Sequence, residues 1–181
     1  MVKIIDIKVG QVIKNEFNLI TRDLLKKYAK ASGDTNPIHT NDIVAERAGL
    51  KGVIAHGLFS YGFISKLFED FLNHENDGKL IKTDVDMRGM VRCGDLLITE
   101  AIVTKIEGKR VFFDVKQTTI TNVDIKKDGK IVKQFEAGER GYVTEKDVAR
   151  GFVKTKEVNE GTLTYREKIV TPGTAVVDLF N

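Results

Sequence analysis

A nine-residue stretch of the sequence, SGDTNPIHT (residues 32–40), gathers residue types that can perform acid–base chemistry. It contains one of the two prolines of the chain and one of its three histidines. Pro37 fixes its own φ angle and pushes Asn36 toward an extended conformation, so the sequence predicts a stiff loop. Such a loop holds the carboxylate of Asp34 near the imidazole of His39. Histidine titrates near neutrality and a nearby carboxylate tunes its pKa, which is what general acid–base catalysis requires.

A second stretch, GVIAHGLFS (residues 52–60), leads into the longest helical pattern of the chain. The first N–H groups of a helix lack intrahelical partners and carry partial positive charge. Gly57 has no side chain, so the carbonyl oxygen of a ligand can approach its N–H closely, as in an oxyanion hole. The alternative for Gly57 is tight helix packing. The alternative for Asp34 and His39 is a helix-capping aspartate and a surface histidine.

Apolar periodicity predicts the helices that position these stretches. Thr21 is expected to cap a helix over RDLLKKYAKAS, which Gly33 ends. Thr40 is expected to cap a short helix over NDIVAERA. From about residue 57 to residue 73, apolar side chains cover most of the helical circumference, which predicts a helix that is buried on all sides.

From Lys79 onward the apolar period changes to two, which predicts strands. Turn signals at residues 93–95, 107–109 and 128–129 separate long runs, so antiparallel pairing is expected. One buried helix followed by such strands predicts an α+β fold with the sheet wrapped round the helix. We expect residues 1–145 to form this domain. Residues 146–181 are expected to form a C-terminal extension of unknown role, with a strand over TLTYREKIV and a turn at residues 171–173.

The composition is that of a soluble globular protein. The 181 residues carry a net charge of +3, and basic and acidic residues are interleaved, so nucleic-acid binding is not expected. No apolar run approaches the roughly 18 residues that span a bilayer, and the N-terminus lacks a signal-peptide pattern, so we expect a cytoplasmic protein without membrane contact. Cys93 is the only cysteine, which excludes an intramolecular disulfide, and it lacks a matched base for nucleophilic chemistry.

Residues 28–63, YAKASGDTNPIHTNDIVAERAGLKGVIAHGLFSYGF, resemble the signature of the MaoC-like hydratase/dehydratase family, the (R)-specific enoyl-thioester hydratases. The family pattern reads approximately Y-A-x-x-S-G-D-x-N-P-I-H, then A-G, then G-x-I-A-H-G. The resemblance covers roughly residues 5–145. It implies a single hot-dog fold, in which an antiparallel sheet wraps round one long central helix. It also implies a homodimer or higher homo-oligomer, or a heterodimer, with active sites near the subunit interface.

The resemblance implies reversible syn addition of water to a trans-2-enoyl thioester, which yields the (R)-3-hydroxyacyl thioester. By motif position Asp34 and His39 are the catalytic pair, and the Gly57 N–H stabilises the thioester oxygen. The supporting residues are Asn36, His56 and Ser60. No metal and no cofactor is expected, because coenzyme A or the phosphopantetheine of an acyl carrier protein serves only as the substrate carrier. Candidates to meet a carrier, or else to be solvated charges, are Lys51, Lys66, Arg88 and Arg92.

The sequence departs from the family pattern at Gly62. Several family members carry a serine there, which helps to position the catalytic aspartate, and neither Ser60 nor Ser65 matches it. We hypothesise that Gly62 frees volume for a bulkier acyl chain; a strict preference for a four-carbon substrate would count against this.

Two other functions compete with the hydratase. The first is a non-catalytic or accessory hot-dog subunit that binds acyl chains in a heterodimeric dehydratase. The second is a hot-dog thioesterase, whose carboxylate would stand on the central helix. That helix offers only Glu69 and Asp70, late in its length.

Overall fold

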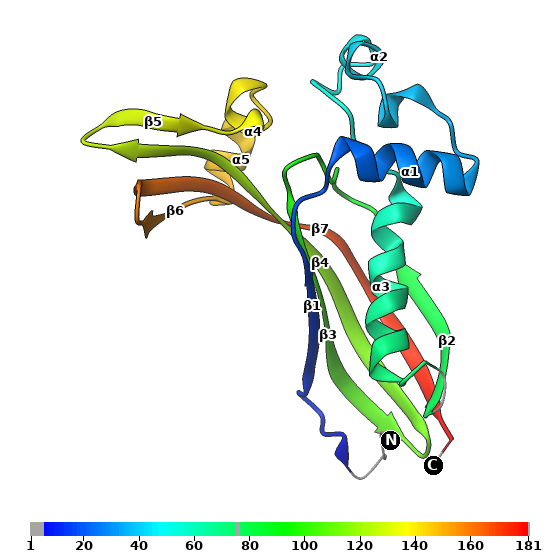
Figure 1. The fold of residues 1–181 in the computed structure, drawn as a ribbon. Helices are drawn as coiled ribbons and strands as arrows, with labels where there is room; N and C mark the ends of the chain where they lie inside the picture. The colour runs from blue at the N-terminus through cyan, green and yellow to red at the C-terminus, as the bar shows by residue number, and fades with distance from the viewer. Residues whose placement is uncertain (1–5, 75–76, 181) are drawn as a thin grey trace.

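In the computed structural model, which describes residues 6–74 and 77–180, a seven-stranded antiparallel sheet lies against one long helix (Figure 1). The helix is α3 (Gly57–Phe71). The sheet order is β1 (Val12–Phe17), β3 (Leu96–Glu107), β4 (Arg110–Lys127), β7 (Gly161–Leu179) and β2 (Gly78–Val85). Two further strands extend it, because β5 (Lys130–Gln134) pairs with β4 and β6 (Val153–Val158) pairs with β7. The predicted α+β arrangement of a sheet round a helix is confirmed.

Three of the predicted turns are found where the sequence placed them. Residues 93–94, 108–109 and 128–129 all form turns. Asp128 and Gly129 both have positive φ, 50° and 76°, which is the geometry of a tight hairpin turn between β4 and β5.

One face of α3 builds the core. Ile64, Leu67 and Phe68 are buried against inward-facing residues of the sheet, including Phe113. The rings of Phe68 and Phe113 meet edge to face, with centroids 5.1 Å apart. The predicted burial on all sides is wrong. Leu58 is 66% exposed, because within one chain the sheet covers only one side of the helix.

The C-terminal residues complete the sheet. We predicted that residues 146–181 form an extension, yet β7 lies between β4 and β2, in register with β4 from Arg110↔Asp178 to Lys126↔Thr162. A boundary at residue 145 therefore does not divide the sheet. The predicted turn at residues 171–173 is also wrong, because Pro172 and Gly173 continue β7 opposite Lys116 and Val115.

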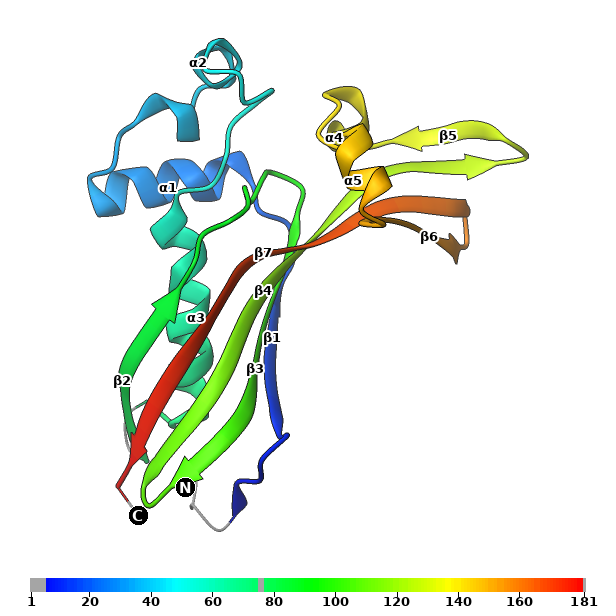
Figure 2. The same ribbon diagram turned by 180° about the vertical axis from the view of Figure 1, so that it is seen from behind.

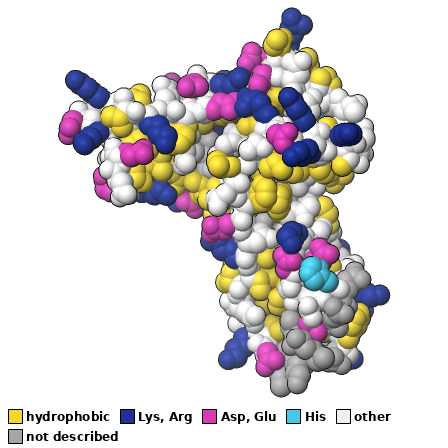
Figure 3. Space-filling model, viewed as in Figure 1, with side chains coloured by type: hydrophobic (Ala, Val, Ile, Leu, Met, Phe, Trp, Pro, Cys, Tyr) yellow, Lys and Arg dark blue, Asp and Glu magenta, His cyan; other side chains and the backbone are white. Residues whose placement is uncertain are grey.

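The outer ends of β4 and β7 leave the body of the molecule and form an arm, residues 124–166, with β5, β6, α4 (Glu136–Glu139) and α5 (Glu145–Ala149) (Figures 1 and 2). On the face shown in Figure 3, basic and acidic side chains are interspersed over the arm and the body. None of the helices in the described part of the chain is long and apolar enough to cross a membrane.

Three short elements precede α3 and carry the candidate site. They are α1 (Arg22–Ser32), the 3₁₀ helix Pro37–His39 and α2 (Asp42–Arg47). The N-cap of α2 is Asn41 rather than the predicted Thr40, since the Asn41 side chain accepts the N–H groups of Ile43 and Val44.

Candidate active site

The helix α1 begins and ends where the sequence predicted, directly before the loop. The Thr21 hydroxyl oxygen accepts the Leu24 N–H at 3.2 Å and caps the start of the helix. Gly33 ends it with a φ of 76° and donates its N–H to the carbonyl oxygen of Ala29 at 3.1 Å. A left-handed residue suits glycine, so the helix ends one residue before Asp34.

Side chains of the loop hold its own backbone in place. The Asp34 carboxylate accepts the Asn36 N–H at 3.3 Å, and the Asn36 side chain accepts the Ile38 N–H at 3.2 Å. Asn36 thereby caps the 3₁₀ helix that begins at Pro37. Asp34 is exposed, so a substrate can reach its carboxylate.

His39 points inward, unlike the surface histidine of the alternative interpretation. Its side chain is buried, and Nδ1 lies 2.9 Å from the carbonyl oxygen of Ile54. A carbonyl oxygen only accepts hydrogen bonds, so Nδ1 carries the proton and donates it. The other ring nitrogen, Nε2, then has a free lone pair and is a hydrogen-bond acceptor.

His56 is a buried residue that contacts both His39 and the backbone of the loop. It is 1% exposed, its ring stacks on His39 with centroids 3.9 Å apart, and Tyr28 lies 4.9 Å away on α1. Its Nε2 donates to the backbone carbonyl oxygen of Asp34 at 3.1 Å. Burial, and secondarily the neighbouring His39, lowers the pKa of His56, so this ring is neutral near pH 7. The buried His56 ring thus holds the backbone of the loop at Asp34.

The fold brings three groups together. A carboxylate oxygen of Asp34 and ring nitrogens of His39 and His56 all lie within 4.8 Å of one another. Two hydrogen bonds of about 2.8 Å through one water bridge such a gap. A carboxylate with two imidazoles is also a donor set that can hold a divalent metal ion, so an activity test needs a chelator control.

The start of α3 offers free N–H groups beside this cluster. Its N-cap, His56, makes no capping bond through its side chain, and Gly57 is exposed. A Cβ atom at position 57 would lie 2.6 Å from the Sδ atom of Met87. Sequence reasoning missed this neighbour; because Met87 is flexible and 49% exposed, a Cβ atom here would require only that the end of its side chain moves.

Ser60, predicted as a supporting residue, anchors α3 through its backbone. Its carbonyl oxygen accepts the side-chain N–H of Gln117 at 2.8 Å, and the same amide nitrogen donates to Thr99 at 3.2 Å. Gln117 is fully buried in β4. Sequence reasoning missed this residue; the available signal was an amide at a buried position of an alternating strand.

The four candidate carrier contacts lie in different settings. Lys51 donates to the Gly141 carbonyl oxygen at 2.7 Å, and Lys66 pairs with Asp70. Arg88 is exposed and pairs with Asp86. Arg92 is only 5% exposed and is not a solvated charge.

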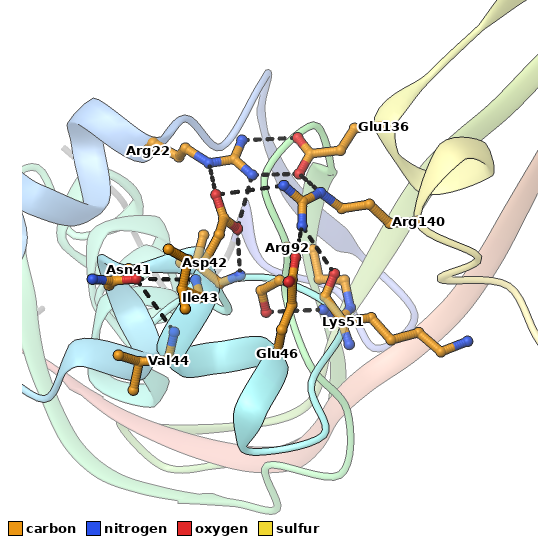
Figure 4. A network of polar contacts seen from close by, with 12 residues as sticks. Arg22, Asn41, Asp42, Ile43, Val44, Glu46, Lys51, Arg92, Glu136 and Arg140 are labelled. Atoms are coloured by element: carbon orange, nitrogen blue, oxygen red, sulfur yellow. Dashed lines mark hydrogen bonds and ion pairs between the residues drawn. The ribbon is translucent and has the colours of Figure 1, made fainter.

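A polar network ties the arm to the helices that flank the loop (Figure 4). Arg22 of α1 donates to Asp42 of α2 at 2.9 and 3.1 Å and to Glu136 of α4. Arg140 donates to Glu46 at 2.6 Å and lies 2.9 Å from Glu136. The network joins residues more than a hundred positions apart and holds α1 and α2 together on both sides of the loop.

The network gives a pH-dependent prediction. Hydrogen bonds from Arg22 are the main cause that lowers the pKa of both Asp42 and Glu136. A carboxylate with a lowered folded-state pKa stabilises the fold above its unfolded pKa, and this stabilisation is lost as pH falls through the folded pKa. We expect Glu136→Gln to lower the free energy of unfolding by about 1 kcal/mol at pH 7, a value reduced for partial exposure.

That difference from wild type should shrink as the pH falls below about 4. Urea unfolding at several pH values measures it. Glu160→Gln, at an exposed ion pair 3.8 Å long, is the control and should show no such trend. A Glu136→Gln difference that stays constant down to pH 3 would contradict the assigned pKa shift.

Gly62 stands in open space. It is exposed, and a Cβ atom there would meet nothing within 4 Å. Gly62→Ser is therefore expected to fold and to gain up to about 0.5 kcal/mol, because serine has the higher helix propensity. If Gly62 frees volume for the acyl chain, the variant should lose activity selectively on longer enoyl thioesters. An equal effect on four-carbon and longer substrates would contradict that hypothesis.

Comparison with known proteins places this geometry in a family. The family model described as MaoC like domain matches residues 7–127. The (R)-specific enoyl-CoA hydratase of Rhodospirillum rubrum is 32% identical over 133 residues, which cover 73% of this chain and 86% of that protein. Among solved structures, the R-hydratase PhaJ1 of Pseudomonas aeruginosa superposes with a TM-score of 0.64 at 21% identity, over 97% of this chain and 83% of that one.

Several relatives are larger proteins that this chain matches only over a small part. The fatty acid synthase beta subunit TOXC of Cochliobolus carbonum is 41% identical over 64 residues, which are 35% of this chain but 3% of that protein. Two further relatives are matched over 5% and 10% of their length.

These likenesses define the fold as a hot-dog fold, the class to which the long helix and its wrapping sheet correspond. The chain belongs to the MaoC-like domain family, whose relatives include enzymes named as hydratases and dehydratases.

Proposed function

We propose that this protein interconverts trans-2-enoyl and (R)-3-hydroxyacyl thioesters by adding and removing water. The observation that carries the proposal is the juxtaposition of the Asp34 carboxylate and the His39 ring within 4.8 Å, next to the free start of α3. The relative from Rhodospirillum rubrum, which is named for this reaction, supports it.

The geometry suits a single bound water. Asp34 and the free Nε2 of His39 hold it, one group removes a proton from it, and a proton is supplied to Cα as the hydroxyl joins Cβ. Because the two groups lie within 4.8 Å of each other, we place both on the same side of the bound substrate, so that hydrogen and hydroxyl arrive on one face and the addition is syn. The N–H of Gly57 donates to the thioester oxygen as negative charge develops there.

The proposal extends to the substrate carrier and to the assembly of subunits. Asp34 is exposed at the mouth of the loop, which leaves room for a substrate held on coenzyme A or phosphopantetheine. We propose that a second hot-dog subunit, identical or related, covers the exposed face of α3 at Leu58.

A thioesterase is a weaker candidate. Glu69 and Asp70 are exposed near the end of α3. At 1.5 Å per residue, Glu69 is about 18 Å along the helix from Gly57, too far to share a substrate with it.

The test is hydration of a four-carbon and an eight-carbon trans-2-enoyl-CoA by the purified chain, followed by loss of the enoyl absorbance. We expect a product of (R) configuration, no release of free thiol, and the same rate after incubation with EDTA. Loss of activity on chelation would replace the acid–base pair with a metal site. No turnover of either substrate by folded protein would favour the accessory subunit.

A further inference from the structure

A small cavity at the junction of arm and body is lined by three basic side chains. Its volume is about 40 Å³, and its lining residues are Met90, Arg92, Tyr142, Arg166 and Lys168. A cavity of this size holds a few atoms, since one water needs about 10–15 Å³ by the same kind of measure. We call it the arginine cavity.

Both arginines are deeply buried, and neither is fully paired. Arg92 is 5% exposed and Arg166 is 6% exposed. Two hydrogen bonds of the Arg92 guanidinium, to the Gly52 carbonyl oxygen and to Met90 Sδ, are 3.5 Å long and therefore weak. Its flat face stacks on the Tyr142 ring at 4.2 Å. A guanidinium presents five N–H donors, and these two long bonds do not use all of them.

Arg166 also keeps an unused donor. It donates to the Tyr142 carbonyl oxygen at 3.2 Å and to the Thr121 hydroxyl at 3.1 Å. Its Nε is buried and has no hydrogen-bond partner within residues 6–74 and 77–180. A buried donor without a partner costs free energy, and more so when it carries charge.

The neighbouring carboxylates balance these charges only in part. Asp147 lies 3.7 Å from both Arg166 and Lys168, beyond hydrogen-bond distance, and its oxygens cap α5 by accepting from Thr144. The Asp95 carboxylate accepts hydrogen bonds from the Thr121 hydroxyl at 2.6 Å and from the backbone N–H of Arg92 at 2.8 Å. Neither carboxylate accepts a hydrogen bond from the guanidinium group of Arg92 or Arg166.

We propose that the arginine cavity binds one small oxyanion, such as inorganic phosphate or sulfate, between Arg92, Arg166 and Lys168. Planar guanidinium groups match the oxygens of such an anion, and buried cations bind it without competition from bulk water. The inference does not depend on the proposed reaction.

The arginine cavity lies between β7 and the backbone segment that supports the candidate site. Arg166 and Lys168 belong to β7, whereas Arg92 forms a β-bridge with Ile54 of the body. Ile54 is the residue that fixes His39 through its carbonyl oxygen. An anion held between these elements joins the base of the arm to the backbone that supports the candidate site.

The experiment is thermal unfolding and isothermal titration with inorganic phosphate, with sodium chloride at equal ionic strength as reference. We expect a saturable rise in Tm with phosphate only. Lys168→Gln, at a side chain that is 29% exposed, should weaken phosphate binding by about 10-fold or more. The matched control is Lys154→Gln, an exposed lysine paired with Glu167, which changes the net charge equally and should bind as wild type.

Two further measurements locate the bound anion and identify its chemical source. Crystals soaked in selenate should show an anomalous peak between Arg92 and Arg166. Phosphopantetheine distinguishes a phosphate ester from a free ion: binding that Lys168→Gln weakens would keep the site and name an ester as its occupant. No saturable effect of phosphate or phosphopantetheine beyond chloride, or equal binding by wild type and Lys168→Gln, would overturn the proposal.

Discussion

Asp34→Asn should lower kcat/KM for enoyl-CoA hydration by about 10²- to 10⁴-fold while leaving the protein folded. The amide keeps the shape of the side chain and can still accept the Asn36 N–H that orders the loop. It cannot take or give a proton. Because Asp34 is exposed, the substitution removes no buried packing, and the free energy of unfolding should change little.

His39→Gln should cost activity on the same scale, since the glutamine amide has no titrating nitrogen. His39 is buried and its ring stacks on His56, so the substitution should also lower the stability of the fold. Matched controls exist on the surface. Asp70→Asn and His74→Gln lie at exposed positions and should retain wild-type rates. Activity above about a tenth of wild type in both Asp34→Asn and His39→Gln would remove the pair from the mechanism.

Phe68→Ala is expected to have the largest effect on stability, about 3–5 kcal/mol. Phe68 is fully buried on α3 and packs edge to face on Phe113 of β4. Removing the ring leaves a cavity at the contact that holds the helix on the sheet. Such a loss is comparable with the whole stability of many domains, so the variant should unfold at much lower urea concentration or fail to fold.

Phe180→Ala provides the matched control, because the same atoms are removed from a side chain that is 44% exposed. It should cost less than about 1 kcal/mol. Urea unfolding at one fixed protein concentration measures both variants, which keeps any contribution of subunit association equal. Similar losses in Phe68→Ala and Phe180→Ala would mean that α3 is not the centre of the core.

The loop of the candidate site could be predicted from the sequence because the residues that shape the loop are close together in the chain. Pro37, Asn36 and Gly33 act on their own neighbours, so the loop and the end of α1 are legible without knowledge of the fold. The entry to α3 at Gly57 is equally local. For the same reason the predicted hairpin at Asp128 and Gly129 is confirmed by the structure.

What the sequence could not supply depends on contacts between distant positions. Arg22 meets Glu136 across 114 residues, and no pattern around either residue signals the other. The place of β7 was missed for a related reason. Its apolar alternation predicts a strand, but the strand that pairs with it is decided by the packing of the whole sheet. The exposed side of α3 was mispredicted because periodicity reports apolar character, not which surface covers it.

The central place of β7 also governs how the chain folds as it is synthesised. Its partners in β2 are roughly 100 residues earlier in the chain, as in the pair Gly78↔Leu179, so the sheet has high contact order. During synthesis on the ribosome, β2 and the edge of β4 that pairs with β7 remain unpaired until the last residues of the chain emerge. We therefore expect nascent chains truncated before residue 161 to depend on chaperones and to aggregate, although the whole loop of the candidate site is already present in them.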